Sequence, residues 1–111
     1  MPDLTLYGLK TCDTCRKARK ALTEAGHTVT LRDVRAEPLS EAERDRFLEV
    51  FGDALINRAS TTWRGLSEEE RTAAPADLLR AHPALMKRPV VAGGGALSLG
   101  WDAAARTSWK V

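Results

Sequence analysis

The sequence predicts an α/β protein in which a strand–helix–strand unit and a later strand–strand–helix unit form one mixed sheet, with a helical segment inserted between them. An apolar run at residues 4–7, a helical pattern over 13–25 and an alternating run over 27–32 follow one another closely, as in a βαβ unit with parallel strands. Residues 40–85 then carry helix-capping residues and prolines, and two later apolar runs flank a triple glycine, as in a hairpin. At 111 residues the chain has room for a single domain.

The elements of the first unit have clear local signals. Leu4 to Tyr7 is a short apolar run, which is typical of a strand buried on both faces. In the following helix, small and apolar residues recur at helical spacing and Gly26 supplies a C-terminal stop. Val29 and Leu31 fall on one face of the next strand, so both strands and the helix can share one core.

The inserted segment begins with a strong helix signal. Ser40 and Glu43 fit a capping box, and an apolar stripe continues from there to Gly52. Residues 54–59 are expected to form a further short helix, and the polar residues 60–62 a loop.

The remaining elements follow from caps, prolines and glycines. Ser67 can cap a helix whose first turn is acidic, and Pro75 interrupts the chain before another helical stretch over 76–81. The triple glycine at 93–95 is expected to be a hairpin turn rather than a phosphate-binding loop, because no helix and no Lys-Ser or Lys-Thr follows it. A short closing helix begins near Asp102.

Composition excludes several classes of protein. A hydrophobic content of 43% and a charged content of 29% are ordinary for a globular protein, and no apolar run approaches the ~20 residues that span a bilayer. The N-terminus shows no secretory signal pattern, so a cytoplasmic location is expected. A net charge of +2 is too small to indicate direct binding of nucleic acid. We therefore expect no membrane binding and no direct binding of nucleic acid. We also expect a monomer.

Cys12 and Cys15 are the only cysteines, and they stand where the first strand gives way to a basic helix. A thiol at a helix N-terminus faces unpaired backbone N–H groups and the positive end of the helix dipole, which favours its thiolate form. Cys15 lies three residues on, on the same helical face and within bonding reach. Strand, turn, Cys-x-x-Cys and helix in that order are typical of a thioredoxin-like redox site, with Cys12 as nucleophile and Cys15 as resolving thiol.

Other interpretations of this region stay open. The cysteines can be small half-buried residues at a helix start, whereas zinc is disfavoured because only His27 and His82 remain as nitrogen ligands, without finger-like spacing. We expect no metal. The positive charge near the thiols either attracts an anionic substrate, such as glutathione, or is the solvated face of a surface helix. The cations concerned are Lys10, Arg16, Lys17, Arg19 and Lys20.

Arg88-Pro89 is the second informative spot. A proline at the first residue of a strand, beside a redox cysteine, is compatible with a cis peptide whose freed backbone groups hold an extended ligand. Arg88 would present several directed donors to an oxyanion or a carboxylate. A solvated arginine before an ordinary trans proline is the alternative.

Four motifs, in order along nearly the whole chain, resemble those of the arsenate reductase/Spx family, and most closely its short YffB-type branch. They are Leu-Tyr-Gly at 6–8, Thr-Cys-Asp-Thr-Cys-Arg-Lys-Ala at 11–18, Thr-Thr-Trp-Arg at 61–64 and Lys-Arg-Pro-Val-Val at 87–91. The resemblance implies a thioredoxin-like fold with a helical insertion. Cys12 matches the family's nucleophile, and Arg88 the arginine before its cis-proline. The ligand-contacting residues that we expect are Thr11, Arg16, Arg58, Arg64, Arg88 and Pro89.

Two departures from the arsenate reductases of this family bear on the substrate. Those enzymes carry an additional arginine after the last strand, where Leu99-Gly100-Trp101 offers glycine, so one oxyanion ligand is missing. They also carry serine at the position of Cys15. A second thiol favours an internal disulfide instead.

The resemblance thus implies a small thiol–disulfide oxidoreductase that uses glutathione or glutaredoxin and holds no bound cofactor. The alternative is an Spx-like redox-sensing regulator, which docks on the RNA polymerase α subunit and is switched by a Cys12–Cys15 disulfide.

Overall fold

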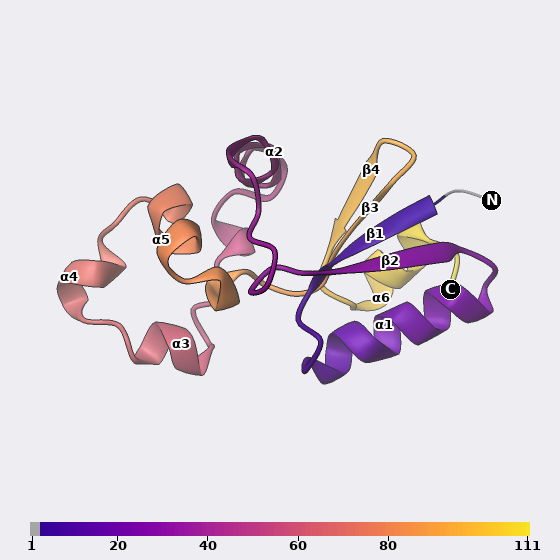
Figure 1. Ribbon diagram of the computed structural model, residues 1–111, viewed down its shortest axis with the longest axis horizontal. Coiled ribbons are helices and arrows are strands. Elements are labelled where there is room, and N and C mark those ends of the chain that lie inside the picture. Colours follow the sequence, from indigo (N-terminus) through magenta and orange to yellow (C-terminus); the bar gives the residue numbers. More distant parts are fainter. Residues whose placement is uncertain (1–2) are drawn as a thin grey trace. The chain divides into compact units, whose positions relative to one another are not determined.

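The computed structural model describes residues 3–111, and these divide into two compact units. One, called here the sheet unit, comprises residues 3–33 and 88–111, and the other, the helical unit, comprises residues 34–87. Figure 1 shows the strands of the first and the short helices of the second. The single-domain organisation expected from the sequence stays a prediction.

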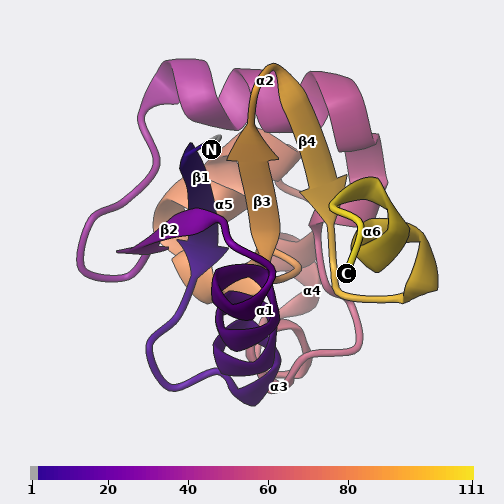
Figure 2. The same cartoon turned by 90° about the vertical axis from the view of Figure 1, so that its right-hand side faces the viewer.

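The sheet unit contains four strands in the order β2-β1-β3-β4. The first two strands pair in parallel, and the hairpin of the last two adds antiparallel to β1. Figure 2 shows β1, β3 and β4 side by side, with α6 next to β4. The elements are β1 (Asp3–Gly8), α1 (Asp13–Glu24), β2 (Thr28–Asp33), β3 (Val90–Gly93), β4 (Ala96–Leu99) and α6 (Ala103–Ser108).

The core of this unit lies between α1 and one face of the sheet. Leu4 and Leu6 of β1 are fully buried, whereas Thr5 and Tyr7, which alternate with them, are half-buried. Strand β1 is therefore fully covered on one face only and not on both as predicted. The buried core cluster is Leu4, Leu6, Cys15, Ala18, Leu22, Val91 and Trp109. The indole Nε1 of Trp109 donates a buried hydrogen bond of 2.7 Å to the Ser98 hydroxyl, which fastens the C-terminal segment to β4.

The helical unit consists of short helices that follow one another without strands. Its helix α2 packs against η1 and α5, and η2 packs against α3 and α5. An isolated bridge between Ile56 and Met86, with the Lys87 N–H donating to the Leu55 carbonyl at 2.7 Å, joins the middle of the unit to its C-terminal end. The helices are α2 (Glu41–Phe51), η1 (Gly52–Leu55), α3 (Thr61–Arg64), α4 (Glu68–Arg71), α5 (Pro75–Ala81) and η2 (Pro83–Leu85).

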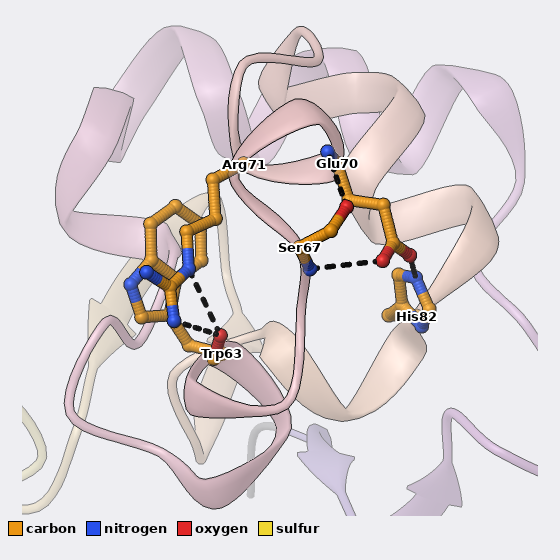
Figure 3. A network of polar contacts seen from close by, with 5 residues as sticks. All are labelled: Trp63, Ser67, Glu70, Arg71 and His82. Atoms are coloured by element: carbon orange, nitrogen blue, oxygen red, sulfur yellow. Dashed lines mark hydrogen bonds and ion pairs between the residues drawn. The ribbon is translucent and has the colours of Figure 1, made fainter.

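Side-chain contacts hold the one-turn helices of this unit in place (Figure 3). Arg71 donates from Nε and Nη2 to the Trp63 carbonyl at 3.3 and 3.2 Å, while its guanidinium lies over the Trp63 ring. Ser67 and Glu70 form a reciprocal capping box at α4, and His82 Nε2 lies 3.5 Å from Glu70 Oε2. Helices this short are marginal alone, so the local capping box and the more distant contacts of Arg71 and His82 together stabilise them.

The fold class predicted from the sequence is confirmed: the sheet and its flanking helices have a thioredoxin-like βαβ…ββα arrangement, with helices between the two halves. Two local predictions were wrong. Residues 54–59 are not a helix, because a 3-10 turn ends at Leu55 and Ile56 enters a β-bridge. Residues 60–62 are not a loop, because the Ser60 hydroxyl caps helix α3 by accepting from the Trp63 N–H.

In the portion of the chain that the structure describes, the helices are too short or too polar for any of them to cross a bilayer.

Candidate active site

The loop between β1 and α1 positions the two thiols. The Cys12 N–H donates to the Leu9 carbonyl at 3.1 Å, which closes a turn, and the Lys10 N–H donates to Asp33 Oδ2 at 3.1 Å, which ties the loop to the end of β2. Cys12 is the N-cap of α1 and has an extended backbone, with φ −83° and ψ 118°. The Cys-x-x-Cys motif therefore places the Cys12 sulfur at the N-terminus of α1.

Cys12 is partly exposed, and its pKa is lowered from the ordinary thiol value. Partial burial of its sulfur acts in the opposite direction and is outweighed by several donors that favour the thiolate. Those donors are the backbone N–H and the thiol of Cys15 and the guanidinium of Arg88, which adds its positive charge. An accessible sulfur that is readily ionised is a nucleophile.

Cys15 differs from Cys12 in both access and acidity. Its side chain is 1% exposed within the core, and burial raises the pKa of its thiol to about 12. The negative charge of Cys12 and the hydrogen bond to it raise the pKa further, whereas the Leu9 N–H and Arg88 act against the rise. At neutral pH Cys15 is a protonated donor to the Cys12 sulfur. Both cysteines are unpaired in this structure.

Arg88 and Pro89 lie beside the thiols, in the sheet unit. The Arg88–Pro89 peptide bond is cis, Pro89 is fully buried and Arg88 is half-buried with its guanidinium at the Cys12 sulfur. The Pro89 carbonyl accepts the Gly100 N–H at 2.9 Å. Gly100 has φ 76°, a backbone region that glycine adopts without a steric cost. This bend joins the end of β4 to the Arg88-Pro89 segment.

Thr11 and Arg16, expected to contact an anion, are exposed next to Cys12. The Arg16 guanidinium forms an ion pair with Asp13, and the Arg16 N–H donates to the Cys12 carbonyl at 3.0 Å. Any contact between Arg16 and an anion would compete with Asp13. The roles of Thr11 and Arg16 stay predictions.

Arg58 and Arg64, the other two expected anion contacts, belong to the helical unit. Arg58 lies over the Trp63 ring at 5.2 Å and pairs with Asp53 at 3.6 Å, and Arg64 Nη2 donates to the Ala59 carbonyl at 2.9 Å. Both guanidinium groups thus already have partners within their own unit. Their part in anion binding stays a prediction.

Gly8 is a residue of this site that the sequence analysis did not single out. A Cβ built on Gly8 would collide with the Cys15 Sγ, so the second sulfur packs directly against the backbone of β1. The sequence did contain a signal for this contact, because a glycine at the end of a strand often marks a close approach of another group.

Residues 3–111 contain no group of three His, Cys, Asp or Glu side chains gathered so as to hold a metal ion. What the arrangement provides is two sulfurs of different acidity and a guanidinium beside the more exposed one. This is suited to nucleophilic attack on sulfur or on an oxyanion.

Comparison with known proteins adds a family likeness to this geometry. A profile of the ArsC family matches residues 7–107. The chain is 35% identical to an uncharacterized protein of Haemophilus influenzae over 105 residues, which cover 89% of this chain and 91% of that protein. It is 30% identical to the global transcriptional regulator Spx of Bacillus subtilis, with 89% of this chain and 80% of Spx covered.

Two solved structures extend the likeness. The YffB protein has a TM-score of 0.87 and 31% identity, with 97% of this chain and 99% of that chain covered. An arsenate reductase-related protein from Brucella melitensis has a TM-score of 0.74 and 36% identity, with 98% and 96% covered.

Proposed function

Because the chain belongs to the ArsC family, we propose that it is a thiol–disulfide oxidoreductase with Cys12 as its nucleophile and with glutathione, or a glutathione-linked glutaredoxin, as its co-substrate. One observation supports this most: the partly exposed Cys12 sulfur has a lowered pKa between the donors of Cys15 and the Arg88 guanidinium.

The first step is attack by the Cys12 thiolate on one sulfur of an oxidised thiol substrate. A disulfide forms between Cys12 and that sulfur, the substrate S–S bond breaks, and the other substrate sulfur leaves as a thiolate that takes a proton from water. Arg88 stabilises the attacking thiolate before the step. It also offers donors to a carboxylate of an incoming glutathionyl group.

The second step releases the remaining substrate sulfur. Once Cys12 is in a disulfide it carries no charge, so the negative charge that helps to raise the pKa of Cys15 is gone. The Cys15 thiol then loses its proton and attacks the Cys12 sulfur, which gives a Cys12–Cys15 disulfide and a reduced substrate thiol. Two electrons have passed from the protein to the substrate, and two glutathione thiols would restore the dithiol and become glutathione disulfide. Attack by glutathione in place of Cys15 is the shorter route.

The bend at Gly100 favours a disulfide substrate over arsenate. The position after the last strand has no side chain to bind an oxyanion, and its N–H is already donated to the Pro89 carbonyl. Arg88 is the guanidinium that acts on the Cys12 sulfur in the described residues, and we propose a sulfur substrate as the physiological one.

A titration of Cys12 reactivity tests the nucleophile. We expect the rate of alkylation by iodoacetamide to rise with pH at a midpoint below that of glutathione measured alongside. Arg88→Gln should move the midpoint upward and slow alkylation at neutral pH roughly tenfold, because the thiolate loses an adjacent positive charge. Arg106→Gln, an exposed cation on α6, is the matched control and should change nothing. A wild-type midpoint equal to that of glutathione would contradict the proposal.

Turnover assays separate the routes and substrates. Wild type, Cys12→Ser and Cys15→Ser would be compared with a glutathionylated peptide and with arsenate, glutathione being the reductant. We expect Cys12→Ser to be inactive with both. Retained turnover in Cys15→Ser would assign resolution to glutathione, and turnover with arsenate alone would overturn the choice of substrate.

A second candidate function is supported by the 30% identity to Spx over 80% of its length. In this proposal the protein is a regulator that docks on the RNA polymerase α subunit, and formation of the Cys12–Cys15 disulfide changes the docking surface. A pull-down with the C-terminal domain of the α subunit, using oxidised and reduced protein, tests it. Equal or no binding in the two redox states would remove this candidate.

A further inference from the structure

The exposed face of α1 carries a strip of positive charge that the reaction at the thiols does not use. We name Arg16, Lys17, Arg19 and Lys20 the basic strip; all four side chains are exposed. Residues 10–24 hold five Lys or Arg and two acids, a net charge of +3, whereas the rest of the chain has a net charge of −1. The positive charge of the protein is therefore concentrated on α1 and the loop that precedes it.

Most of this charge is not neutralised inside the protein. Arg16 pairs with Asp13, but Lys17, Arg19 and Lys20 form no ion pair with any residue in the described range 3–111. The other acid of this helix, Glu24, stands at its end. Like charges at such close spacing repel one another and lower the stability of a helix, which an oppositely charged partner would offset.

The strip is aligned with the reactive sulfur. Positions four, seven and eight residues beyond Cys12 fall near the same side of a helix, so Arg16, Arg19 and Lys20 lie in one row that starts at the thiol. The opposite side of α1 is buried through Cys15, Ala18 and Leu22. A molecule bound to Cys12 and lying along the exposed side of α1 therefore passes over the basic strip.

We propose that the basic strip docks an acidic protein segment whose disulfide is the substrate of Cys12. This proposal rests on the proposed function and specifies its substrate class. Cys12 and Lys20 are eight residues apart, or ~12 Å along the helix axis. An extended chain covers that distance in about four residues. The expected target is thus a cysteine with acidic residues within about five positions on one side.

A protein segment fits this surface better than a nucleic acid does. The strip begins at a thiol whose reaction partner must carry sulfur, and a nucleic acid carries none. Glutathione is too small to reach the far end of the strip while it is bonded to Cys12. The contact is a surface one, so it should act on the rate of association and should weaken with salt.

Single-turnover exchange with peptide disulfides tests the proposal. The probes are three eight-residue peptides of one design, each with a cysteine blocked as a neutral 2-thiopyridyl disulfide and followed by four Glu, four Gln or four Lys. A second set places the charges before the cysteine. The released thiopyridone is followed by absorbance at low salt and again at about 0.5 M salt, where the Debye length falls to a few Å. We expect the better acidic peptide to react at least about tenfold faster than the lysine peptide at low salt, and the difference to shrink to about twofold at high salt.

A pair of variants assigns the effect to the strip. Arg19→Gln/Lys20→Gln removes two charges from it, and Arg106→Gln/Lys110→Gln removes two exposed charges from α6 and the turn after it. We expect the first variant to lose most of the preference for the acidic peptide and to keep its rate with the glutamine peptide. The second should keep the preference. Circular dichroism would show that both variants fold.

The outcomes separate this proposal from the proposed function. If the glutamine peptide reacts no faster than with a free thiol, the proposed function fails. Binding of a cysteine-free acidic peptide to Cys12→Ser, by fluorescence anisotropy, would then still report the docking surface, and its absence would overturn that as well. If the three peptides react equally fast at low salt, the proposed function stands and the docking proposal fails. Tighter binding of a DNA oligonucleotide than of the acidic peptide, lost in Arg19→Gln/Lys20→Gln, would assign the strip to nucleic acid instead.

Discussion

Helices α1 and α4 begin in different ways, and the difference marks where the chemistry is. At α4 the Ser67 hydroxyl accepts the Glu70 N–H at 3.1 Å, and the Glu70 carboxylate accepts the Ser67 N–H at 3.0 Å. At α1 the same position is held by Cys12, which forms no such side-chain cap. Instead the Cys15 N–H, three residues on, lowers the pKa of the Cys12 sulfur.

The contrast follows from the acceptor strength of sulfur. A neutral thiol accepts hydrogen bonds weakly, so a cysteine N-cap contributes little to the stability of a helix. A thiolate accepts them well, so the same amide that is poorly used in the thiol form favours ionisation. Helix α1 lacks a stabilising cap and has a reactive sulfur at its N-terminus, whereas α4 has the stabilising cap and no reactive group there.

Cys12→Ser should remove the difference between α1 and α4 most completely, because serine at the N-cap of α1 can form a conventional side-chain cap. We expect alkylation and disulfide exchange to be lost altogether, while the free energy of unfolding rises by about 0.5–1 kcal/mol through the new cap. Mass spectrometry of the alkylated protein and urea unfolding measure the two effects. A serine variant that is less stable than wild type would show that the cysteine already acts as a good cap.

Gly8→Ala should disturb the second sulfur from below. The added methyl group collides with the Cys15 Sγ, so we expect a loss of about 2–3 kcal/mol in the free energy of unfolding and a rise in the Cys12 pKa as its donor is displaced. Gly65→Ala is the control, because Gly65 has φ −80° and the new Cβ would make ordinary contacts only. The control should change stability by less than about 1 kcal/mol. Equal effects of the two substitutions would mean that Cys15 moves aside freely.

Alkaline pH should weaken the protein through Cys15. The folded state keeps the Cys15 proton up to a pKa of about 12, whereas the unfolded chain loses it near an ordinary thiol value of ~8.5. Between those values the folded state binds more protons, so stability falls as pH rises, by about 1.4 kcal/mol per pH unit for this group. The measurement is urea unfolding of wild type and Cys15→Ser at pH 8.5 and 9.5. A constant difference between the two proteins would contradict the raised pKa.

Ser67→Ala should produce the smallest effect and leave the thiols untouched. Loss of the cap at α4 is expected to lower the free energy of unfolding by about 1 kcal/mol, with no change in the alkylation rate of Cys12. Hydrogen bonds from the backbone N–H and the hydroxyl of Ser67 lower the pKa of Glu70. The contribution of Glu70 is therefore present above its unfolded pKa of ~4.3 and is lost as pH falls through the lowered value. A Glu70→Gln variant that differs from wild type equally at pH 6 and pH 3 would contradict this.

The sequence analysis succeeded where the signals are local. The order of strands and helices in the sheet unit follows from apolar periodicity and from Gly26, and the caps at Ser40 and Ser67 appear in the structure as capping boxes. The cis bond at Arg88–Pro89 is present as the family resemblance implied. These features depend on a few neighbouring residues, so a pattern along the chain contains them.

It failed where order depends on residues distant in sequence. The polar side chains of residues 60–62 led to the prediction of a loop there. Helix α3 forms there because Ser60 caps it and because Arg71, in the next helix, donates a hydrogen bond to the Trp63 carbonyl. The burial of Cys15 against Gly8 belongs to the same class, because it depends on how α1 packs against β1. The position of Arg88 at the Cys12 sulfur also depends on a distant contact, the pairing of β3 with β1, and it was expected from the family resemblance and not from a local pattern.

Because the two sulfurs differ in exposure, the rate at which Cys15 is modified reports local unfolding of the protein. A bulky thiol reagent applied without denaturant should modify Cys12 quickly, because Cys12 is not buried. It should modify Cys15, which is 1% exposed, only when α1 moves away from the sheet. The rate of the slow modification then measures how often that part of the molecule unfolds locally, much as amide hydrogen exchange does. No fluorescent label or engineered cysteine is needed to follow the motion.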